Sequence, residues 1–219
     1  MKKINKTKEV FCLEDRLSNI DEKKKIKIIN SAMEEFSKNT YDKASTNRIV
    51  EKAGISKGSL FNYFESKKNL YEYLKVFSIV EISEAIVGNV NWEEPDLFKR
   101  IKEIALIKLK IFRKYPYIIG FTKRINSGKS IEELKKIYEE YMPNIYEKIY
   151  TKNIDFNLFR EDVGIEEVMN IFIWTFEKLG ENYLNQIKFG EKVNTEEMAD
   201  EFDRYVDVLK KGFYKWEEF

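Results

Sequence analysis

One short segment, residues 56–64 with the sequence SKGSLFNYF, carries the side chains best suited to binding chemistry. Its polar and basic members are Lys57, Ser59, Asn62 and Tyr63. Side chains of these types donate hydrogen bonds to phosphates and to the edges of bases. No acidic residue occurs between Lys52 and Glu65, whereas a solvated helix face usually carries several. The segment is therefore predicted to face a polyanion, with Leu60 and Phe64 turned toward the core.

Capping residues around this segment predict the helices that hold it in place. Ser45 and Thr46 are suited to cap a short helix that ends at Ala53, and Gly54 follows it. Ser56 is a natural N-cap for a second short helix, which runs to the end of the segment. A helix, a glycine-containing turn and a helix of this size are typical of the DNA-binding helix-turn-helix, whose second helix lies in the major groove.

Longer amphipathic helices are predicted on both sides of this unit. Residues 21–39 place Ile26, Ile29, Met33 and Phe36 at three- and four-residue spacing, which gives one buried stripe. A second amphipathic helix is expected over residues 67–88. The short helices are therefore expected to pack between two longer ones.

The charge of the chain is unevenly distributed along its length. The whole chain has 39 Lys and Arg against 38 Asp and Glu, a net charge of +1. Up to Lys75 the counts are 17 and 11, and beyond it they are 22 and 27. A basic first third predicts contact with a polyanion. Chance clustering in a lysine-rich composition is the alternative explanation of the charge.

The composition excludes most enzyme classes. The chain has no His, which excludes a histidine general base, a Ser-His-Asp triad and a histidine-ligated metal site. Its one Cys, Cys12, cannot form an internal disulfide or a thiolate cluster. The acidic pairs Glu132-Glu133 and Glu139-Glu140 have the pattern of a solvated helix face. We therefore predict no enzyme activity, no metal site and no cofactor.

The small number of turn-forming residues predicts an all-α fold. Only 9 Gly and 3 Pro occur in 219 residues, and 43% of the residues are hydrophobic, which is enough for a packed core. The apolar stretch at residues 10–13 is too short for a secretion signal, and no apolar run approaches the ~20 residues that span a bilayer. We expect a cytoplasmic protein without a membrane partner.

The rest of the chain is predicted to form a second, helical bundle domain. Helices are expected over residues 96–114, around residues 118–125 and 131–150, over residues 165–188, and from residue 195 onward. The predicted domains are residues 21–75 for DNA binding and residues 76–219 for effector binding and dimerisation. The long helix at residues 67–88 joins the two.

The helix-turn-helix region resembles the N-terminal domain of the TetR family of bacterial transcriptional regulators. The similarity spans residues 24–74, about a quarter of the chain, and is strongest in TNRIVEKAGISKGSLFNYFESKKNLYEYL. The positions that match the family's pattern are Thr46, Ile49, Val50, Ala53, Gly54, Ile55, Ser56, Gly58, Ser59, Phe61, Phe64, Lys67 and Leu70. Phe61 departs from the family, which commonly has Tyr there. A phenyl ring cannot donate the hydrogen bond to phosphate that a Tyr hydroxyl provides.

The resemblance implies a homodimer that binds a palindromic operator in double-stranded DNA. The implied DNA-binding residues are Thr46, Asn47, Lys57, Gly58, Ser59, Asn62, Tyr63 and Lys67. Thr46 and Asn47 begin the supporting helix, while Tyr63 and Lys67 are placed against the DNA backbone. Hydroxyls and lysines at helix N-termini complement phosphate charge, so the chemistry of these residues agrees with the implied roles.

The two long C-terminal helices are predicted to form the dimer interface. Their apolar residues repeat at bundle spacing, and in the similar family these helices pair with their symmetry mates. The predicted interface residues are Phe172, Leu179, Tyr183, Phe202, Tyr205, Leu209 and Gly212. Trp216 continues the second stripe, and Asn194 and Thr195 are candidate caps of the last helix. The alternative is that one chain buries both stripes within itself.

The resemblance also implies an effector pocket in the larger domain. Aromatic residues gather in its middle segments, and the candidate pocket residues are Phe112, Tyr115, Phe121, Tyr138, Tyr141 and Trp174. These segments lack a clear charged cluster, which favours a largely apolar or aromatic small molecule. Plain core packing is the alternative for each residue.

Two functional hypotheses follow from the sequence. The first is a ligand-responsive transcriptional repressor, which a small-molecule effector releases from its operator. The second is a DNA-associated structural or interaction protein on the same fold, without such an effector. The first 20 residues, with Lys2, Lys3, Lys6, Lys8 and Arg16, form either a basic arm that reaches DNA or a frayed terminus.

Overall fold

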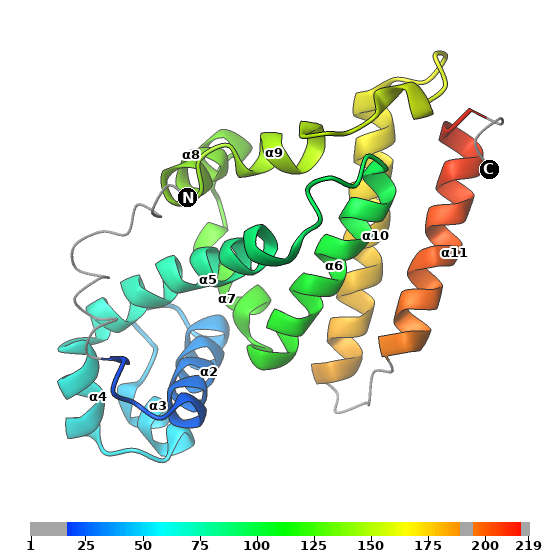
Figure 1. The fold of residues 1–219 in the computed structure, drawn as a ribbon. Coiled ribbons are helices and arrows are strands. Elements are labelled where there is room, and N and C mark those ends of the chain that lie inside the picture. Colours follow the sequence, from blue (N-terminus) through cyan, green and yellow to red (C-terminus); the bar gives the residue numbers. More distant parts are fainter. Residues whose placement is uncertain (1–16, 189–194, 216–219) are drawn as a thin grey trace. The chain divides into compact units, whose positions relative to one another are not determined.

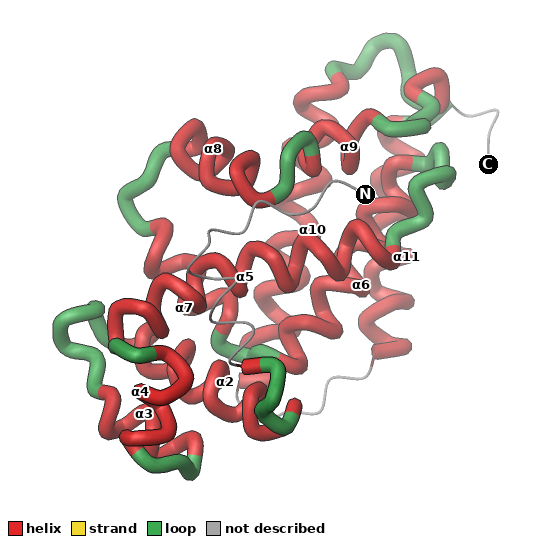
Figure 2. Tube along the Cα trace, turned by 60° about the vertical axis from the view of Figure 1, so that its left-hand side comes forward, coloured by secondary structure: helices red, strands yellow, loops and turns green. Residues whose placement is uncertain are grey.

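The computed structural model describes residues 17–188 and 195–215, and these residues form helices joined by loops, without a strand (Figure 2). The helices are α2 (Glu22–Lys38), α3 (Thr46–Ala53), α4 (Lys57–Phe64), α5 (Lys67–Asn89), α6 (Leu97–Lys114), α7 (Ile118–Asn126), α8 (Ile131–Tyr141), α9 (Ile145–Thr151), η1 (Phe156–Leu158), α10 (Ile165–Lys188) and α11 (Thr195–Phe213). The all-α prediction is confirmed. Cys12, Asn194, Trp216 and the first 16 residues, where most of the predicted arm falls, lie outside the described residues.

The described chain divides into two compact units. Unit 1 contains residues up to Glu84 together with residues 114–144, and unit 2 contains residues 85–113 and those from Ile145 onward. These units are defined by packing alone, and the functional boundary after Lys75 stays a prediction. The helices α7 and α8, from the predicted effector domain, pack with the helix-turn-helix in unit 1.

The core of unit 1 forms around α2. This helix buries one face, which includes Ile29, Met33 and Phe36, and it packs against α3 and α7 (Figure 1). The rings of Phe36 and Phe121 both meet the ring of Tyr71 edge-on, at centroid distances of 4.9 and 5.8 Å. Aromatic contacts of this geometry add to the stabilisation that burial alone provides.

The helix α7 is also tied to the C-terminal end of α2 by hydrogen bonds. Arg124 donates from Nε to the carbonyl oxygen of Ser37 at 2.8 Å and from Nη2 to that of Lys38 at 3.3 Å. The last carbonyl groups of a helix lack partners within the helix, so this side chain satisfies groups that otherwise face solvent. Gly120 lies close to Ser37 as well, since a Cβ at Gly120 would be 3.4 Å from the Cβ of Ser37.

The core of unit 2 is formed by α6, α10 and α11. Its buried apolar residues include Phe98, Phe172, Phe176 and Phe202. The ring of Phe98 stacks on that of Phe172, with centroids 4.8 Å apart. The end of α11 is fixed by backbone hydrogen bonds to the segment after η1, from the Arg160 amide to the Phe213 carbonyl at 2.9 Å among others.

Two charged side chains are buried among the described residues of unit 2. Arg100 is fully buried, and its guanidinium donates only to backbone carbonyl oxygens within the described residues. Asp96 caps α6 by accepting from the Lys99 amide at 3.2 Å, and it also accepts from Lys210 and, at 2.9 Å, from the Tyr214 hydroxyl. Buried charges of this kind are stable only when such partners surround them.

None of the described helices is both long and apolar enough to cross a membrane.

Candidate nucleic-acid interface

The turn between α3 and α4 has the caps that the sequence predicts. Ser45 accepts a hydrogen bond from the Arg48 amide at the start of α3, and Ser56 accepts one from the Ser59 amide at 3.0 Å at the start of α4. Gly54 ends α3 in the left-handed conformation, with φ 67°. A side chain at this position would strain the backbone, which explains the glycine.

The second short helix presents polar residues to solvent and apolar residues to the core. Lys57, Gly58 and Asn62 are exposed, whereas Leu60 and Phe64 are buried. A helix that carries exposed polar side chains without an acidic one suits the major groove, where donors and acceptors are read directly. This is the orientation that the sequence predicts for the segment.

The other predicted contact residues lie around the same two helices. Asn47 is exposed, while Thr46, Ser59, Tyr63 and Lys67 are half-buried; the Ser59 hydroxyl lies 2.9 Å from the Ser56 hydroxyl. Phe61, which replaces the Tyr common in the similar family, is also half-buried. The eight residues implied as DNA contacts therefore all belong to unit 1, on α3, on α4 and at the start of α5.

A buried carboxylate that the sequence analysis did not single out fixes α3 against α2. Glu35 is only 5% exposed and accepts hydrogen bonds from the Arg48 guanidinium, at 3.0 Å from Nε, and from the Ser45 amide at 2.9 Å. The Arg48 hydrogen bonds, together with that of the Ser45 amide, lower the pKa of Glu35 although burial opposes them. No local spacing signals this pair, because its members are 13 residues apart.

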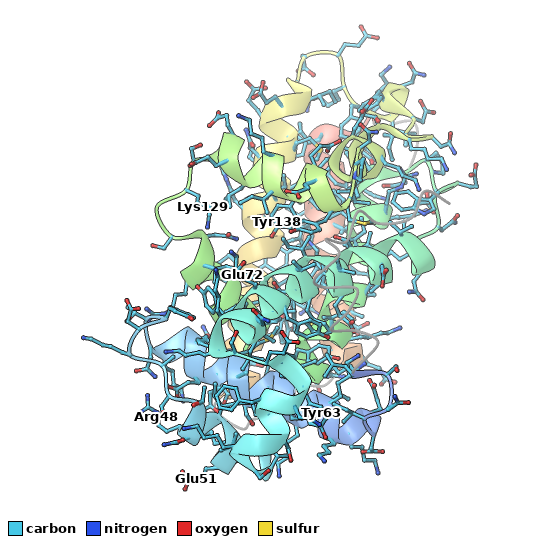
Figure 3. All side chains as sticks on the ribbon, turned by 90° about the vertical axis from the view of Figure 1, so that its left-hand side faces the viewer. Arg48, Glu51, Tyr63, Glu72, Lys129 and Tyr138 are labelled. Atoms are coloured by element: carbon cyan, nitrogen blue, oxygen red, sulfur yellow. The ribbon has the colours of Figure 1, made fainter. Side chains whose placement is uncertain are left out.

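A second acid on α2 forms ion pairs beside the first. Glu34 accepts from Lys52 at 2.8 Å and from Lys38 at 2.6 Å. Burial alone would raise the pKa of Glu34, but the hydrogen bonds from these two lysines outweigh it and lower the pKa. The basic residues of α3 are thus engaged within the protein, although they lie beside the predicted interface. Arg48 and Glu51 of α3 and Tyr63 of α4 are labelled in Figure 3.

The residues predicted for the effector pocket differ in their surroundings. Tyr115 and Phe121 are fully buried in the core of unit 1, which favours plain packing for them. Trp174 of α10 is 65% exposed. The half-buried candidates are Tyr138 and Tyr141, on α8 in unit 1, and Phe112, on α6 in unit 2. Burial raises the pKa of Tyr138.

Most residues predicted for the dimer interface are buried within the chain instead. Five of them belong to the core of unit 2, and these are Phe172, Leu179, Tyr183, Phe202 and Leu209. The apolar stripes of α10 and α11 therefore pack within unit 2, and the dimer interface itself stays a prediction. The physical reason is that α6 supplies a third apolar helix, against which both stripes are covered.

A different face of α10 and α11 leaves large apolar side chains in solvent. Ile171 and Trp174 on α10 are 39% and 65% exposed, and Tyr205 and Val208 on α11 are 43% and 67% exposed. Gly212 is exposed as well, and a Cβ there would meet no atom within 4 Å. Tyr205 and Gly212 are the two predicted interface residues that remain accessible. Ile171, Trp174 and Val208 were not predicted for the interface, because the apolar spacing in the sequence marks only the buried face of each helix.

Among the described residues, no group of three or more His, Cys, Asp and Glu is placed to bind a metal ion.

Comparisons with known proteins agree with this geometry. Residues 28–74 match the sequence profile described as bacterial regulatory proteins, tetR family. An uncharacterised HTH-type transcriptional regulator of Bacillus subtilis, YvdT, is 26% identical over 190 residues, which cover 86% of this chain and 90% of that protein. The nucleoid occlusion factor SlmA of Vibrio vulnificus is 27% identical over 111 residues, 49% of this chain and 53% of that protein.

The fold is shared with solved structures. A TetR family transcriptional regulator from Chloroflexus aurantiacus has a TM-score of 0.59 and 22% identity, covering 92% of this chain and 98% of that one. The fold and the helix-turn-helix thus define a DNA-binding regulator of transcription. Residues 28–74 thus match the N-terminal domain of the TetR family, the chain is similar to TetR-family transcriptional regulators, and the resemblance found in its sequence is confirmed. Proteins of this family are generally DNA-binding regulators rather than enzymes.

Proposed function

We propose that this protein is a ligand-responsive repressor, which binds a palindromic operator as a homodimer and is released by a small-molecule effector. The observation that carries the proposal is the accessible face of α4, where Lys57, Gly58 and Asn62 are exposed between buried Leu60 and Phe64. A helix fixed in this way presents its polar side chains to base edges with little loss of conformational freedom.

The first experiment selects bound sequences from a random duplex pool and measures the affinity of the enriched duplex. Substitution of Lys57 or Asn62 by Ala is expected to weaken binding by roughly 1–3 kcal/mol and to relax the sequence preference. Lys52→Ala is the matched control, because this lysine is also exposed on the helix-turn-helix but pairs with Glu34. An unchanged affinity for both Lys57→Ala and Asn62→Ala contradicts the assignment of α4 to the groove.

In this proposal the dimer forms through the exposed apolar face of α10 and α11, which comprises Ile171, Trp174, Tyr205 and Val208. Members of this set are three residues apart on each helix, so each pair lies on one side of its helix. Exposed large apolar side chains that gather in this way are typical of protein interfaces, and a two-fold dimer covers them by the same face of a second copy.

The oligomeric state tests this face directly. Trp174→Glu is expected to convert a dimer into a monomer in light scattering at micromolar concentration, because an interface must then bury an unpaired charge. Phe156→Glu is the control, since Phe156 is another exposed aromatic of unit 2, at 42%, but lies on η1 outside this face. A wild-type monomer, or a dimer that persists in Trp174→Glu, contradicts the proposed interface.

Release of the operator depends on the spacing of the two recognition helices. A two-fold dimer meets half-sites about 34 Å apart or a multiple of this distance, so a shift of a few ångströms weakens the complex. An effector that binds a mis-spaced conformation more tightly therefore releases DNA. We place the effector beside Tyr138 and Tyr141 and expect it to be largely apolar or aromatic. Alanine at these positions should impair release while the affinity for DNA stays unchanged.

The second candidate function is a DNA-associated interaction protein without an effector. The similarity to a protein named as a nucleoid occlusion factor favours it, although the matched region covers only half of each chain. A library of small molecules separates the two functions. If none of the compounds lowers affinity for the enriched duplex, while the protein binds that duplex specifically, this second function is favoured.

A further inference from the structure

The basic side chains around the helix-turn-helix fall into two groups. Arg48 and Lys52 of α3 are held by carboxylates of α2, in the ion pairs described above. By contrast, Lys24 and Lys27 of α2 are exposed and form no ion pair with a described residue. No carboxylate among the described residues therefore neutralises these two charges.

The ammonium group of Lys24 lies over the recognition helix. Its Nζ is 5.8 Å from the centroid of the Tyr63 ring, near the C-terminal end of α4. A cation above an aromatic ring is attracted by the ring face, which orients the ammonium group without using up its N–H donors. The Asp21 carboxylate is the N-cap of α2 and accepts a hydrogen bond from the Lys24 backbone amide at 3.1 Å.

The ammonium group of Lys27 lies at the turn that precedes the same helix. A Cβ at Gly54 would be 3.2 Å from Lys27 Nζ. Residues three apart lie on one side of a helix, so Lys24 and Lys27 form one edge of α2. This edge reaches the turn before α4 through Lys27 and Tyr63 near the end of α4 through Lys24.

A second lysine and tyrosine pair lies at the other end of α2. Lys67 Nζ is 4.7 Å from the centroid of the Tyr41 ring and 3.4 Å from the Asp42 carbonyl oxygen. The length of α2 gives the separation of the two pairs, because Lys24 is near its first residue and Tyr41 follows its last residue, Lys38. Lys24 and Lys38 are 14 residues apart by number, which is about 21 Å along a helix. The two backbones that border a major groove are about 12 Å apart or more. The two pairs are thus far enough apart to meet different strands.

We infer that Lys24 and Lys27 contact operator phosphates on one flank of the groove, opposite the flank that Lys67 contacts. This inference rests on the proposed function and extends its interface to a helix outside the helix-turn-helix. The ligand is the phosphate backbone of duplex DNA, so the contribution of both lysines is independent of base sequence.

The test is a salt series with the duplex enriched from the random pool. Each phosphate contact contributes about 0.9 to the slope of log affinity against log salt. Lys24→Ala and Lys27→Ala are each expected to flatten the slope by about this amount, so that affinity falls about threefold less between 50 and 200 mM salt. Both variants should lose the same factor on unrelated duplexes, and Lys24→Arg should restore the slope.

Lys25→Ala is the matched control, because Lys25 is one residue from Lys24 and two from Lys27 on α2 and therefore points to another side of the helix. Slopes of Lys24→Ala and Lys27→Ala that equal those of the wild type and of Lys25→Ala overturn the inference. In that case Lys57→Ala still weakens specific binding, and the proposed function stands. If the pool yields no enriched duplex, the proposed function itself fails, and the inference fails with it.

Discussion

Units 1 and 2 each contain a buried charged side chain that ties distant backbone segments together, but they satisfy the charge in different ways. Glu35 in unit 1 meets a cation, Arg48, as well as the Ser45 amide. Among the described residues, Arg100 in unit 2 donates hydrogen bonds to backbone carbonyl oxygens only, those of Trp92, Glu94, Ile149 and Lys152. The four carbonyl groups belong to two segments, one before α6 and one at the end of α9, so Arg100 joins these segments.

The difference shows how much each tie depends on a single residue. One partner of Glu35 is the half-exposed Arg48 side chain. Water can reach this site and solvate the Glu35 carboxylate if the Arg48 side chain is lost. The partners of Arg100 are dipoles that one planar guanidinium connects at once, and burial lowers the pKa of this group although nearby acids oppose the shift. A guanidinium has five donors in a fixed arrangement, which no other side chain reproduces. Unit 2 is therefore expected to be the more sensitive to the loss of its tie.

The largest expected effect comes from Arg100. Arg100→Met removes the donors of four buried or half-buried carbonyl groups, and we expect a loss of about 3–5 kcal/mol in the free energy of unfolding. Arg100→Lys keeps the charge but cannot span two segments, so it should be nearly as damaging. Urea unfolding followed by circular dichroism measures both.

The control for this substitution is the adjacent residue of the same helix. Lys99 is exposed, and Lys99→Met is expected to leave the unfolding midpoint almost unchanged. Arg100→Lys with the stability of the wild type contradicts the importance of the carbonyl contacts and leaves only the charge as the cause.

A smaller and pH-dependent effect is expected for Glu35→Gln. The amide keeps an acceptor for the Ser45 N–H but loses the charge that Arg48 binds, which should cost about 1–2 kcal/mol near neutral pH. Because the folded pKa of Glu35 lies below its unfolded value of about 4.3, this stabilisation is present above that value and is lost as the pH falls through the folded pKa. Wild type and variant should therefore converge in acid.

The measurement is the unfolding free energy of both proteins over a pH series from neutral to about 3. A difference that stays constant over the whole series would show that the Glu35 charge contributes nothing, and that shape alone matters at this site.

The sequence predicts the helices of this protein better than the long-range hydrogen bonds of its buried charged side chains. Ser45, Gly54 and Ser56 act within three residues of the groups they cap, so their roles are visible in local spacing. Arg100 lies in a helix rich in Lys, where it has the pattern of a solvated face, and its acceptors are up to 52 residues away. Nothing local marks it as buried.

The candidate interface shows the same division. The exposure of Lys57 and Asn62 follows from helical spacing, and the structure agrees with it. The position of Lys24 beside Tyr63 depends on how α2 packs against the helix-turn-helix, which the spacing of either segment does not specify. The stripes on α10 and α11 were correctly recognised as apolar, but the sequence did not reveal that α6 covers them.

The smallest expected effect on the free energy of unfolding is that of Lys52→Ala, which removes a surface ion pair rather than a buried one. Lys52 is 46% exposed at its side chain and contacts Glu34, which a second lysine, Lys38, also contacts. Lys52→Ala is therefore expected to change the free energy of unfolding by about 0.5 kcal/mol or less, since exposed pairs contribute little and Glu34 keeps a cation. The same urea titration measures it, at low and at 0.5 M salt. A loss as large as that of Glu35→Gln would mean that the two acids of α2 act as one network, and a double variant with Glu35→Gln would then be less than additive.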